Sequence, residues 1–591
     1  MTSLDLALVG NGSIAALIDV LGSISWCCFP RFDGDPAFCA LLAGPEPANA
    51  NGTFEIELDG SVRSEQEYLP NTPILVTRFY DAGGNAVEIT DFCPRYESGD
   101  ALVCPPVLVR RIRPLAGRPS VRVGVRPASD YGCDPRHAVS GANHLSYPGS
   151  PPLRLTMNTS VEPILDAVPF AVKETITLIF GPDSAIETLD DADGLLQKTE
   201  KHWLDWRRGV QFAGEWTDAV VRAAITLELT AYEPTGAIVP SITTSIPEAP
   251  NSGRTWDYRY CWPRDAYFTV AALSRVGQLR STERYLDFLF RVAAQNEDSR
   301  LIPIYDLDGG EIPAERVAPC LPGYRGMGPV RVGNKASEQA QHDLYGEAVL
   351  SAEKLFDDSA RRSRERNEYE AFTRLEGFGH QAVRLHDKPD AGLWELRGVE
   401  RVHTYSSLMC WVACDRLAEY ARRINRMDRA DFWRQRATEI HAVISRRSWN
   451  ASLNAFTATM EGDSLDASLL LMPRLGFLEA GDPRFVGTVA AIEKHLKHGD
   501  FVYRYVERDD FGVPENAFLV CTFWYIEALA AMGGARREHA RALFEKVLGA
   551  RNRHGLLAED LDPRTLEQWG NFPQTYSMAG IIDCALALSE K

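Results

Sequence analysis

The pattern of hydrophobic and polar positions changes about a third of the way along the chain. In the first 195 residues or so the alternation has a period of two, as in Val121–Arg126 (VRVGVR), which predicts a strand with one buried face. The segment Val172–Phe180 (VKETITLIF) is rich in the β-branched and aromatic residues that favour strands. Gly, Pro, Asn and Asp interrupt the region about every ten residues. We therefore expect residues 1–195 to form an antiparallel β-sandwich.

A helical period dominates the rest of the chain. The charged segment Glu200–Arg208 predicts a linker helix within residues 196–214, and apolar residues then recur at three- and four-residue steps, first along residues 216–231. Candidate helices begin near residues 217, 265, 281, 337, 360, 404, 428, 464, 485, 516, 535 and 575. Twelve helices without convincing strands predict six antiparallel pairs closed into an (α/α)6 barrel over residues 215–591. A helical solenoid is the alternative, although no fixed-period repeat is visible. The expected fold class is α+β, multidomain.

Composition and charge narrow the function. The 591 residues include 63 Lys and Arg against 81 Asp and Glu, a formal charge of −18. Nucleic acids and anionic membranes bind preferentially to basic protein surfaces. Neither is therefore the expected partner of this acidic chain, and a neutral ligand is favoured. No stretch of about 18 consecutive apolar residues predicts a membrane span. The first residues carry no secretory signal pattern, so we expect a cytoplasmic location. Assembly into a homo-oligomer is left open.

The cysteines and histidines do not suggest metal or redox chemistry. Twelve cysteines are scattered along the chain without a CxxC pair, and we expect them to be buried, reduced thiols. Cys410 and Cys414 lie four residues apart in a helical stretch and are interpreted as core. The histidines show no metal-ligand spacing. No metal or organic cofactor is therefore expected.

Five long loops interrupt the predicted helices, at residues 233–264, 300–336, 387–403, 499–515 and 550–574. Loops of this length in a compact domain are usually functional, and all five are rich in aromatic residues, Arg and carboxylates. Aromatic faces and paired polar groups are what a neutral polyhydroxyl ligand requires. The loops therefore indicate a carbohydrate site.

The segment Arg254–Asp265 (RTWDYRYCWPRD) is the densest of these groups, with four aromatic residues, three Arg and two Asp. An Arg next to an Asp can hold vicinal sugar hydroxyls, one partner donating and the other accepting. The alternative is a structural salt-bridge cluster with packed aromatic rings. We favour a functional site because so many polar groups before a helix are costly unless they are used.

Two loop carboxylates stand out as candidates for acid–base chemistry. Glu395 follows Trp394 in GLWELR, and apolar surroundings raise the pKa of a carboxyl group so that it can act as an acid near neutral pH. An ion pair with Arg397 or a helix-entry role is the alternative. Glu559, in GLLAED, lies far away in the sequence, and by itself it could be an ordinary surface residue.

Two further segments have weaker signals. Tyr503–Tyr505 (YRY) places Arg504 between aromatic residues, and the alternative is simple packing. The Gly-rich Pro322–Gly326 (PGYRG) lacks a phosphate-binding pattern, so we interpret it as a turn that shapes a pocket wall and includes Tyr324.

Taken together and in this order, these segments resemble glycoside hydrolase family 15, the glucoamylase and trehalase family. VGNGSIAALID followed by WCCFPRFD resembles the N-terminal β domain of bacterial members, and WDYRYCWPRDA, GYRG, GLWELRG, PENAFLVCTFWYIEAL and GNFPQTYS resemble the barrel. The resemblance covers essentially the whole chain and implies a β-sandwich, a linker helix and an (α/α)6 barrel. It also implies an enzyme that cleaves α-glucosidic bonds from the non-reducing end with inversion and releases β-glucose.

The resemblance implies roles for individual residues. Glu395 matches the general acid and Glu559 the general base, which in inverting enzymes lie about 6.5–9.5 Å apart to admit a water molecule. The substrate-binding positions implied by the match are Tyr258, Trp262, Arg264, Asp265, Trp394, Arg504 and Tyr324. Two positions depart from the family pattern: Leu396 stands where fungal members have a second Glu, and no His follows Gln574 as it does in many bacterial members. Both departures could change which glucoside is preferred.

Several functions remain to be separated. A small glucoside such as trehalose is favoured over starch, because no secretion signal or starch-binding module is evident. A glucoamylase or isomaltose-type activity is the alternative within the class. An α-glucoside phosphorylase would not need a base such as Glu559, and a non-catalytic sugar-binding protein would not need either carboxylate.

Overall fold

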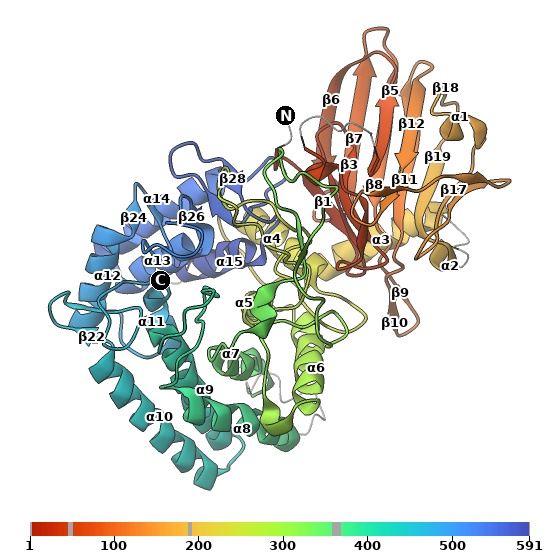
Figure 1. Cartoon of the computed structure of the whole chain (residues 1–591). Coiled ribbons are helices and arrows are strands. Elements are labelled where there is room, and N and C mark those ends of the chain that lie inside the picture. The colour runs from red at the N-terminus through yellow and green to blue at the C-terminus, as the bar shows by residue number, and fades with distance from the viewer. Residues whose placement is uncertain (1–2, 45–50, 187–191, 357–367, 590–591) are drawn as a thin grey trace.

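The computed structural model describes residues 3–44, 51–186, 192–356 and 368–589. A β-rich part at the N-terminal end and a larger helical part lie side by side, with α3 (Ala192–Arg208) between them in the sequence (Figure 1). This arrangement confirms the expected order of a β-rich domain followed by a helical domain.

The N-terminal part contains two antiparallel sheets whose facing side chains form one apolar core. The first sheet contains β1 (Ala7–Gly10), β2 (Ala15–Ile18), β3 (Ile24–Phe29), β4 (Asp35–Phe38), β5 (Thr53–Leu58), β12 (Ser120–Arg126) and β18 (Phe170–Ala171). The second contains β6 (Ser61–Tyr68), β7 (Leu75–Asp81), β8 (Ala86–Phe92), β11 (Leu108–Ala116), β15 (Val139–Ser140), β16 (His144–Tyr147), β17 (Leu153–Met157) and β19 (Ile176–Pro182). Smaller elements are the pairs β9 (Tyr96–Ser98) with β10 (Ala101–Val103) and β13 (Ala128–Ser129) with β14 (Asp134–Pro135), and the short helices α1 (Glu162–Leu165) and α2 (Asp183–Ile186).

The two strands predicted from the sequence are both present, with one shifted start. In β12, Val121 and Val123 are fully buried and lie opposite Leu58 and Ile56 of β5, as the alternating pattern requires. β19 begins at Ile176 rather than at Val172, because pairing with β11 starts at Ile176 and pairing with β17 only at Leu178. The residue composition therefore predicted that a strand is present here, and the strands that pair with it determine the residue at which it begins.

The C-terminal part is built from helices joined by long loops. The helices are α4 (Thr217–Thr230), α5 (Pro263–Arg275), α6 (Arg280–Ala294), α7 (Leu344–Ser351), α8 (Glu368–Leu385), α9 (Thr404–Arg423), α10 (Met427–Arg447), α11 (Met472–Leu475), α12 (Pro483–His495), α13 (Leu519–Met532), α14 (Gly534–Gly549) and α15 (Thr575–Ser589). The helical turn Ala467–Leu471 runs directly into α11. The strands β20 to β28 are two-residue pieces within the loops: Arg316–Val317, Arg331–Val332, Trp449–Asn450, Ala455–Phe456, Lys497–His498, Phe501–Val502, Ala517–Phe518, Asp560–Leu561 and Gln568–Trp569.

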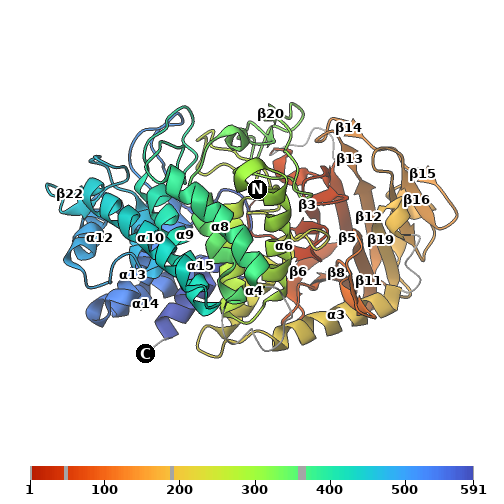
Figure 2. The same ribbon diagram turned by 90° about the horizontal axis from the view of Figure 1, so that it is seen from below.

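Helix contacts close the barrel. The inner ring runs α5, α7, α9, the 467–475 segment, α13 and α15, and α15 packs again on α5. The outer helices α4, α6, α8, α10, α12 and α14 cover this ring (Figure 1, Figure 2). Inner helices such as α15 are buried along almost their whole length, whereas outer helices such as α10 bury one face. The ring confirms the predicted (α/α)6 barrel.

The sandwich and the barrel share a polar interface. Arg95, after β8, is buried and forms an ion pair of 2.6 Å with Glu228 of α4. The Trp26 indole of β3 donates a hydrogen bond of 2.8 Å to the carbonyl of Ile242, in the first of the long loops of the barrel. Buried contacts of this kind require both parts to be folded together.

One prediction about the cysteines is wrong. A disulfide joins Cys133 of the sandwich to Cys320 in a barrel loop, and the two residues are 187 positions apart. The other ten cysteines are free, and all of these except Cys104 are buried, as expected. The sequence offers no signal for the pair, because only the packing of the two domains brings these loops together.

The disulfide predicts how many thiol groups of the chain can react. Under denaturing conditions without reductant, ten thiols per chain should react, against twelve after reduction. Replacing Cys133 with Ser should lower the free energy of unfolding by about 2–4 kcal/mol, because the unfolded chain regains the freedom that the cross-link removed. Thiol titration and thermal unfolding measure the two effects. Twelve reactive thiols before reduction would contradict the bond.

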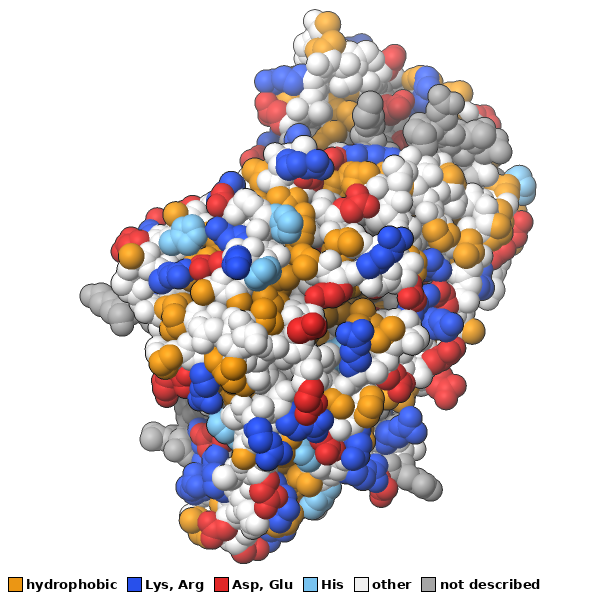
Figure 3. Space-filling model, turned by 60° about the vertical axis from the view of Figure 1, so that its left-hand side comes forward, with side chains coloured by type: hydrophobic (Ala, Val, Ile, Leu, Met, Phe, Trp, Pro, Cys, Tyr) orange, Lys and Arg blue, Asp and Glu red, His pale blue; other side chains and the backbone are white. Residues whose placement is uncertain are grey.

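The surface carries charges of both signs. On the face drawn in Figure 3, acidic and basic side chains are interspersed rather than gathered into patches. Across the part of the chain that the structure describes, no helix has the length and apolar character needed to cross a membrane.

Candidate active site

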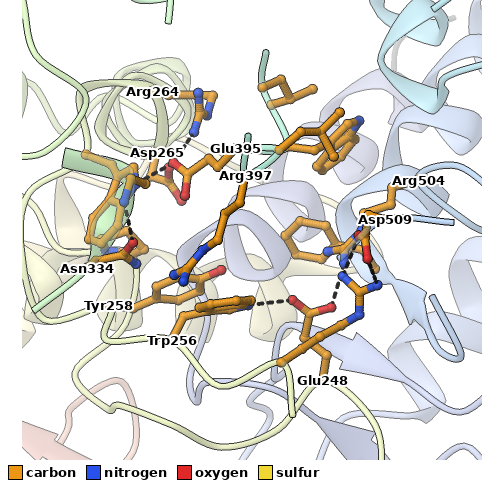
Figure 4. A pocket seen from close by; sticks show the side chains of 18 of the residues that line it. Glu248, Trp256, Tyr258, Arg264, Asp265, Asn334, Glu395, Arg397, Arg504 and Asp509 are labelled. Carbon is orange, nitrogen blue, oxygen red and sulfur yellow. Dashed lines mark hydrogen bonds and ion pairs between the residues drawn. The ribbon is translucent and has the colours of Figure 1, made fainter. Parts of the chain in front are cut away.

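A pocket opens at one end of the barrel, at the end where the inner helices α5, α13 and α15 begin (Figure 4). Its walls come from all five long loops predicted from the sequence, or from the residues that directly follow them. The lining residues are Pro240, Glu248, Arg254, Trp256, Tyr258, Trp262, Arg264, Asp265, Asn334, Ala336, Leu393–Arg397, Arg504, Tyr505, Asp509–Phe511, Phe518, Gln574 and Tyr576. This mixture of aromatic rings and convergent polar groups is typical of a small-molecule site.

Glu395 lies on one side of this pocket, next to Arg264. Its Oε1 atom accepts hydrogen bonds of 2.8 Å from Trp262 Nε1 and of 2.8 Å from Arg264 Nη2. The backbone at Glu395 has a φ of 57°, in the left-handed region that few non-glycine residues adopt. Gly392 makes the tight loop possible, because a Cβ there would come within 2.8 Å of the His403 ring. The loop thus holds a half-buried carboxyl group at the cavity.

Glu559 occupies a different environment. It is 1% exposed and does not itself line the pocket, and its Oε1 accepts a hydrogen bond of 2.7 Å from the hydroxyl of Tyr258, which does. Burial raises the pKa of Glu559 to about 8, and the negative charge of Glu248 acts in the same direction. A Cβ at Gly570 would lie 2.6 Å from the Cβ of Glu559, which is too close for two carbon atoms. Glycine at this position therefore allows the backbone after β28 to lie against Glu559.

Two aromatic rings connect these carboxyl groups. Tyr258, hydrogen-bonded to Glu559, packs edge-to-face on Trp262, hydrogen-bonded to Glu395, with 5.5 Å between the ring centroids. Within the described residues the two carboxyl groups share no hydrogen bond. They therefore belong to one site without touching each other.

Arg264 and Asp265 lie at the start of α5, where Pro263 is well suited to the first helical position. The Arg264 guanidinium bridges Glu395 and Asp343, with an Nη1 to Oδ2 distance of 2.9 Å to the latter. Asp265 is buried, and the loss of hydration raises its pKa to about 7. The pair offers a donor and an acceptor at the bottom of the cavity.

Of the other residues predicted to bind substrate, Trp394 and Arg504 line the pocket and Tyr324 does not. The Trp394 indole donates a hydrogen bond of 2.7 Å to Asp466, and Arg504 forms an ion pair of 2.7 Å with Glu248. Tyr324 is buried and packs edge-to-face on Trp569, with 6.1 Å between centroids. Its role is therefore structural support of the neighbouring loop.

Sequence reasoning missed several lining residues. Trp256, Arg254 and Tyr576 belong to segments that it did single out, but Glu248 and Asn334 were not named. Glu248 follows a proline in SIPEAP, without any motif spacing to mark it. Among the described residues, no group of three or more His, Cys, Asp or Glu side chains could hold a metal ion.

The comparisons with known proteins agree along the whole chain. Glycosyl hydrolases family 15 matches residues 214–586, and a trehalase-like N-terminal domain matches residues 4–157. A trehalase of Thermoplasma volcanium is 31% identical, with 98% of this chain and 93% of that protein covered. A trehalase of Mycobacterium tuberculosis is 31% identical, with 98% and 89% covered. A bacterial glucoamylase solved with acarbose shares the fold, with a TM-score of 0.70 at 14% identity and coverage of 98% and 93%. The chain therefore belongs to glycoside hydrolase family 15 and is a glycoside hydrolase.

Proposed function

We propose that the protein is a trehalase, which hydrolyses trehalose with inversion at the attacked carbon. The observation that carries the proposal is the pair of carboxyl groups, Glu395 on the pocket wall and Glu559 buried behind Tyr258 of the same wall, separated by the contacting rings of Tyr258 and Trp262. Inverting glycosidases need two such groups with space for a water molecule between them. The names of relatives that match almost end to end favour trehalose as the substrate.

The two carboxyl groups divide the chemistry. Glu559 takes a proton from water, and the resulting hydroxide adds to the anomeric carbon while the bond to the bridging oxygen breaks. Glu395 gives its proton to that oxygen, so the second glucose leaves as a neutral alcohol. Glu559 ends protonated and Glu395 ionised, and exchange with solvent restores both. Burial suits Glu559 for this task, because a desolvated carboxylate is a stronger base.

The pocket rim favours a short substrate. Arg397 lies over the Trp256 ring, 4.7 Å from its centroid, and Trp256 packs edge-to-face on Phe511 at 5.1 Å. Arg397 also forms an ion pair with Glu315, and Arg254 forms one with Asp509, so the guanidinium groups of Arg397 and Arg254 are both held in place. Leu396 stands beside this rim, where fungal members of the family have an acidic residue. A packed rim of this kind suits a disaccharide better than a long glucan.

The decisive experiment follows the anomers by proton NMR. Inverting hydrolysis of trehalose should give equal initial amounts of α- and β-glucose, because one ring is inverted and the other keeps its configuration. Maltose, isomaltose and longer glucans should react more slowly. Phosphate should not be required, since strict dependence on it would indicate the phosphorylase alternative. Faster release from maltose or glucans would favour the glucoamylase-type alternative.

The remaining assignments belong to the same proposal. They are the division of the chain into residues 1–195, 196–214 and 215–591, and binding of the terminal glucose by Arg264, Asp265 and the neighbouring aromatic residues. A cytoplasmic location stays a prediction, and assembly into a homo-oligomer stays open.

A further inference from the structure

Glu248 is a carboxylate of the pocket wall that the mechanism above does not use. Its side chain is 5% exposed and lines the cavity on the side opposite Glu395 (Figure 4). Oε1 accepts a hydrogen bond of 2.9 Å from the Trp256 indole, and Oε2 one of 2.7 Å from Arg504 Nη2. The Asn516 side chain holds the Glu248 carbonyl at 2.8 Å. The group is therefore fixed at both ends.

Glu248 also lies in the electrostatic environment of Glu559. After burial, its negative charge is the largest influence that raises the pKa of Glu559. The Tyr258 hydroxyl and the Arg504 guanidinium act in the opposite direction. The same charge also raises the pKa of buried Asp560, the next residue in the chain. Glu248 thus faces Glu559, Asp560, Tyr258 and Arg504 within one cluster.

We propose that Glu248 is a positioning residue of the hydrolytic centre, which holds Arg504 and Trp256 on the pocket wall and makes Glu559 a stronger base by its negative charge. The inference rests on the proposed function, because it takes Glu559 as the base. Glu248 itself is the poorer candidate for that role. Its Oε1 and Oε2 atoms already accept hydrogen bonds from the Trp256 indole and the Arg504 guanidinium.

The test is the pH profile of kcat/KM on trehalose. Because Glu559 must be ionised to accept the water's proton, activity falls as the pH drops through the pKa of the cluster that contains it. Replacing Glu248 with Gln removes the like charge, so the acidic limb should move to lower pH by about one unit. The plateau of kcat should fall about tenfold, because the weaker base and the displaced Arg504 both slow the reaction.

Two other variants test how the surroundings of Glu559 set the position of the acidic limb. Tyr258→Phe removes a hydrogen bond that stabilises the ionised form of Glu559, so the limb should move to higher pH. Glu527→Gln is the matched control, since Glu527 of α13 pairs with Arg474 at 2.9 Å, is largely buried and does not line this pocket. It loses the same charge and should leave the limb in place.

The outcomes separate the inference from the proposed function. A limb that stays in place in Glu248→Gln, with a lower plateau, would overturn the inference and leave Glu248 a purely structural role. Loss of turnover at every pH in this variant, with turnover retained in Glu559→Gln, would make Glu248 the base. A wild-type protein that hydrolyses no α-glucoside would overturn the proposed function itself. Should Glu248→Gln alone fail to fold, the comparison of Arg504→Gln with the double variant Arg504→Gln/Glu248→Gln provides the test, because only the double variant also lacks the Glu248 charge. Its limb should lie at lower pH than that of Arg504→Gln, and equal limbs would overturn the inference.

Discussion

Replacing Glu395 with Gln should lower kcat/KM on trehalose by about 10³-fold. The amide keeps the size of the side chain and can still contact Trp262 and Arg264, which now bind the carboxyl oxygen at 2.8 Å each. It cannot, however, give a proton to the bridging oxygen, so glucose must leave as an alkoxide. Initial rates of glucose release, with binding measured separately by calorimetry, would show a large loss of kcat and a small change in affinity.

A substrate that needs no proton identifies the acid. The Gln variant should retain much more of its activity on α-glucosyl fluoride than on trehalose, because fluoride leaves without protonation. The Glu315→Gln variant, which disturbs the rim ion pair with Arg397 but neither candidate carboxyl group, should lower both activities to a similar, smaller extent. An equal loss on both substrates in Glu395→Gln would argue against the role of acid.

The fold could be predicted largely from periodicity. α9 and α15 begin at Thr404 and Thr575, where the sequence predicts helices, because each helix must bury one stripe of side chains and the stripe is visible in the sequence. The positions at which the apolar stripe is interrupted also predicted all five long loops. The start of β19 and the Cys133–Cys320 bond were not predicted, since both depend on partners far away in the chain.

The site could be predicted only in part. From the residues alone, Glu395 and Glu559 were two separate candidates, each with an ordinary alternative, and the resemblance to a family was needed to pair them. The structure places Glu395 on the pocket wall and buries Glu559 next to it, where each is hydrogen-bonded by one of two lining residues, Trp262 and Tyr258, which lie four residues apart in a single segment. Glu248 escaped notice because its partner Arg504 is 256 positions away. Contacts between loops that are far apart in the sequence form only in the folded barrel, so no local spacing of residues predicts them.

The complementary variant, Glu559→Gln, should lower kcat/KM on trehalose by about 10³-fold as well, through the other half of the reaction. Water bound near the pocket then has no group to take its proton, although Tyr258 can still donate its hydroxyl hydrogen to the amide oxygen where it now contacts Oε1 at 2.7 Å. Because the ionisable base is gone, the acidic limb of the residual pH profile should no longer report a group with a pKa of about 8.

Azide provides the decisive control for the base. It attacks carbon without losing a proton, so adding it to Glu559→Gln should restore turnover and give β-glucosyl azide, while Glu395 still protonates the leaving oxygen. Azide should not rescue Glu395→Gln on trehalose, because the defect there lies on the leaving-group side. The configuration of the azide product, read by proton NMR, reports from which face the sugar is attacked. An α-configured product, or rescue of both variants alike, would be incompatible with a water-activating base at Glu559 opposite an acid at Glu395.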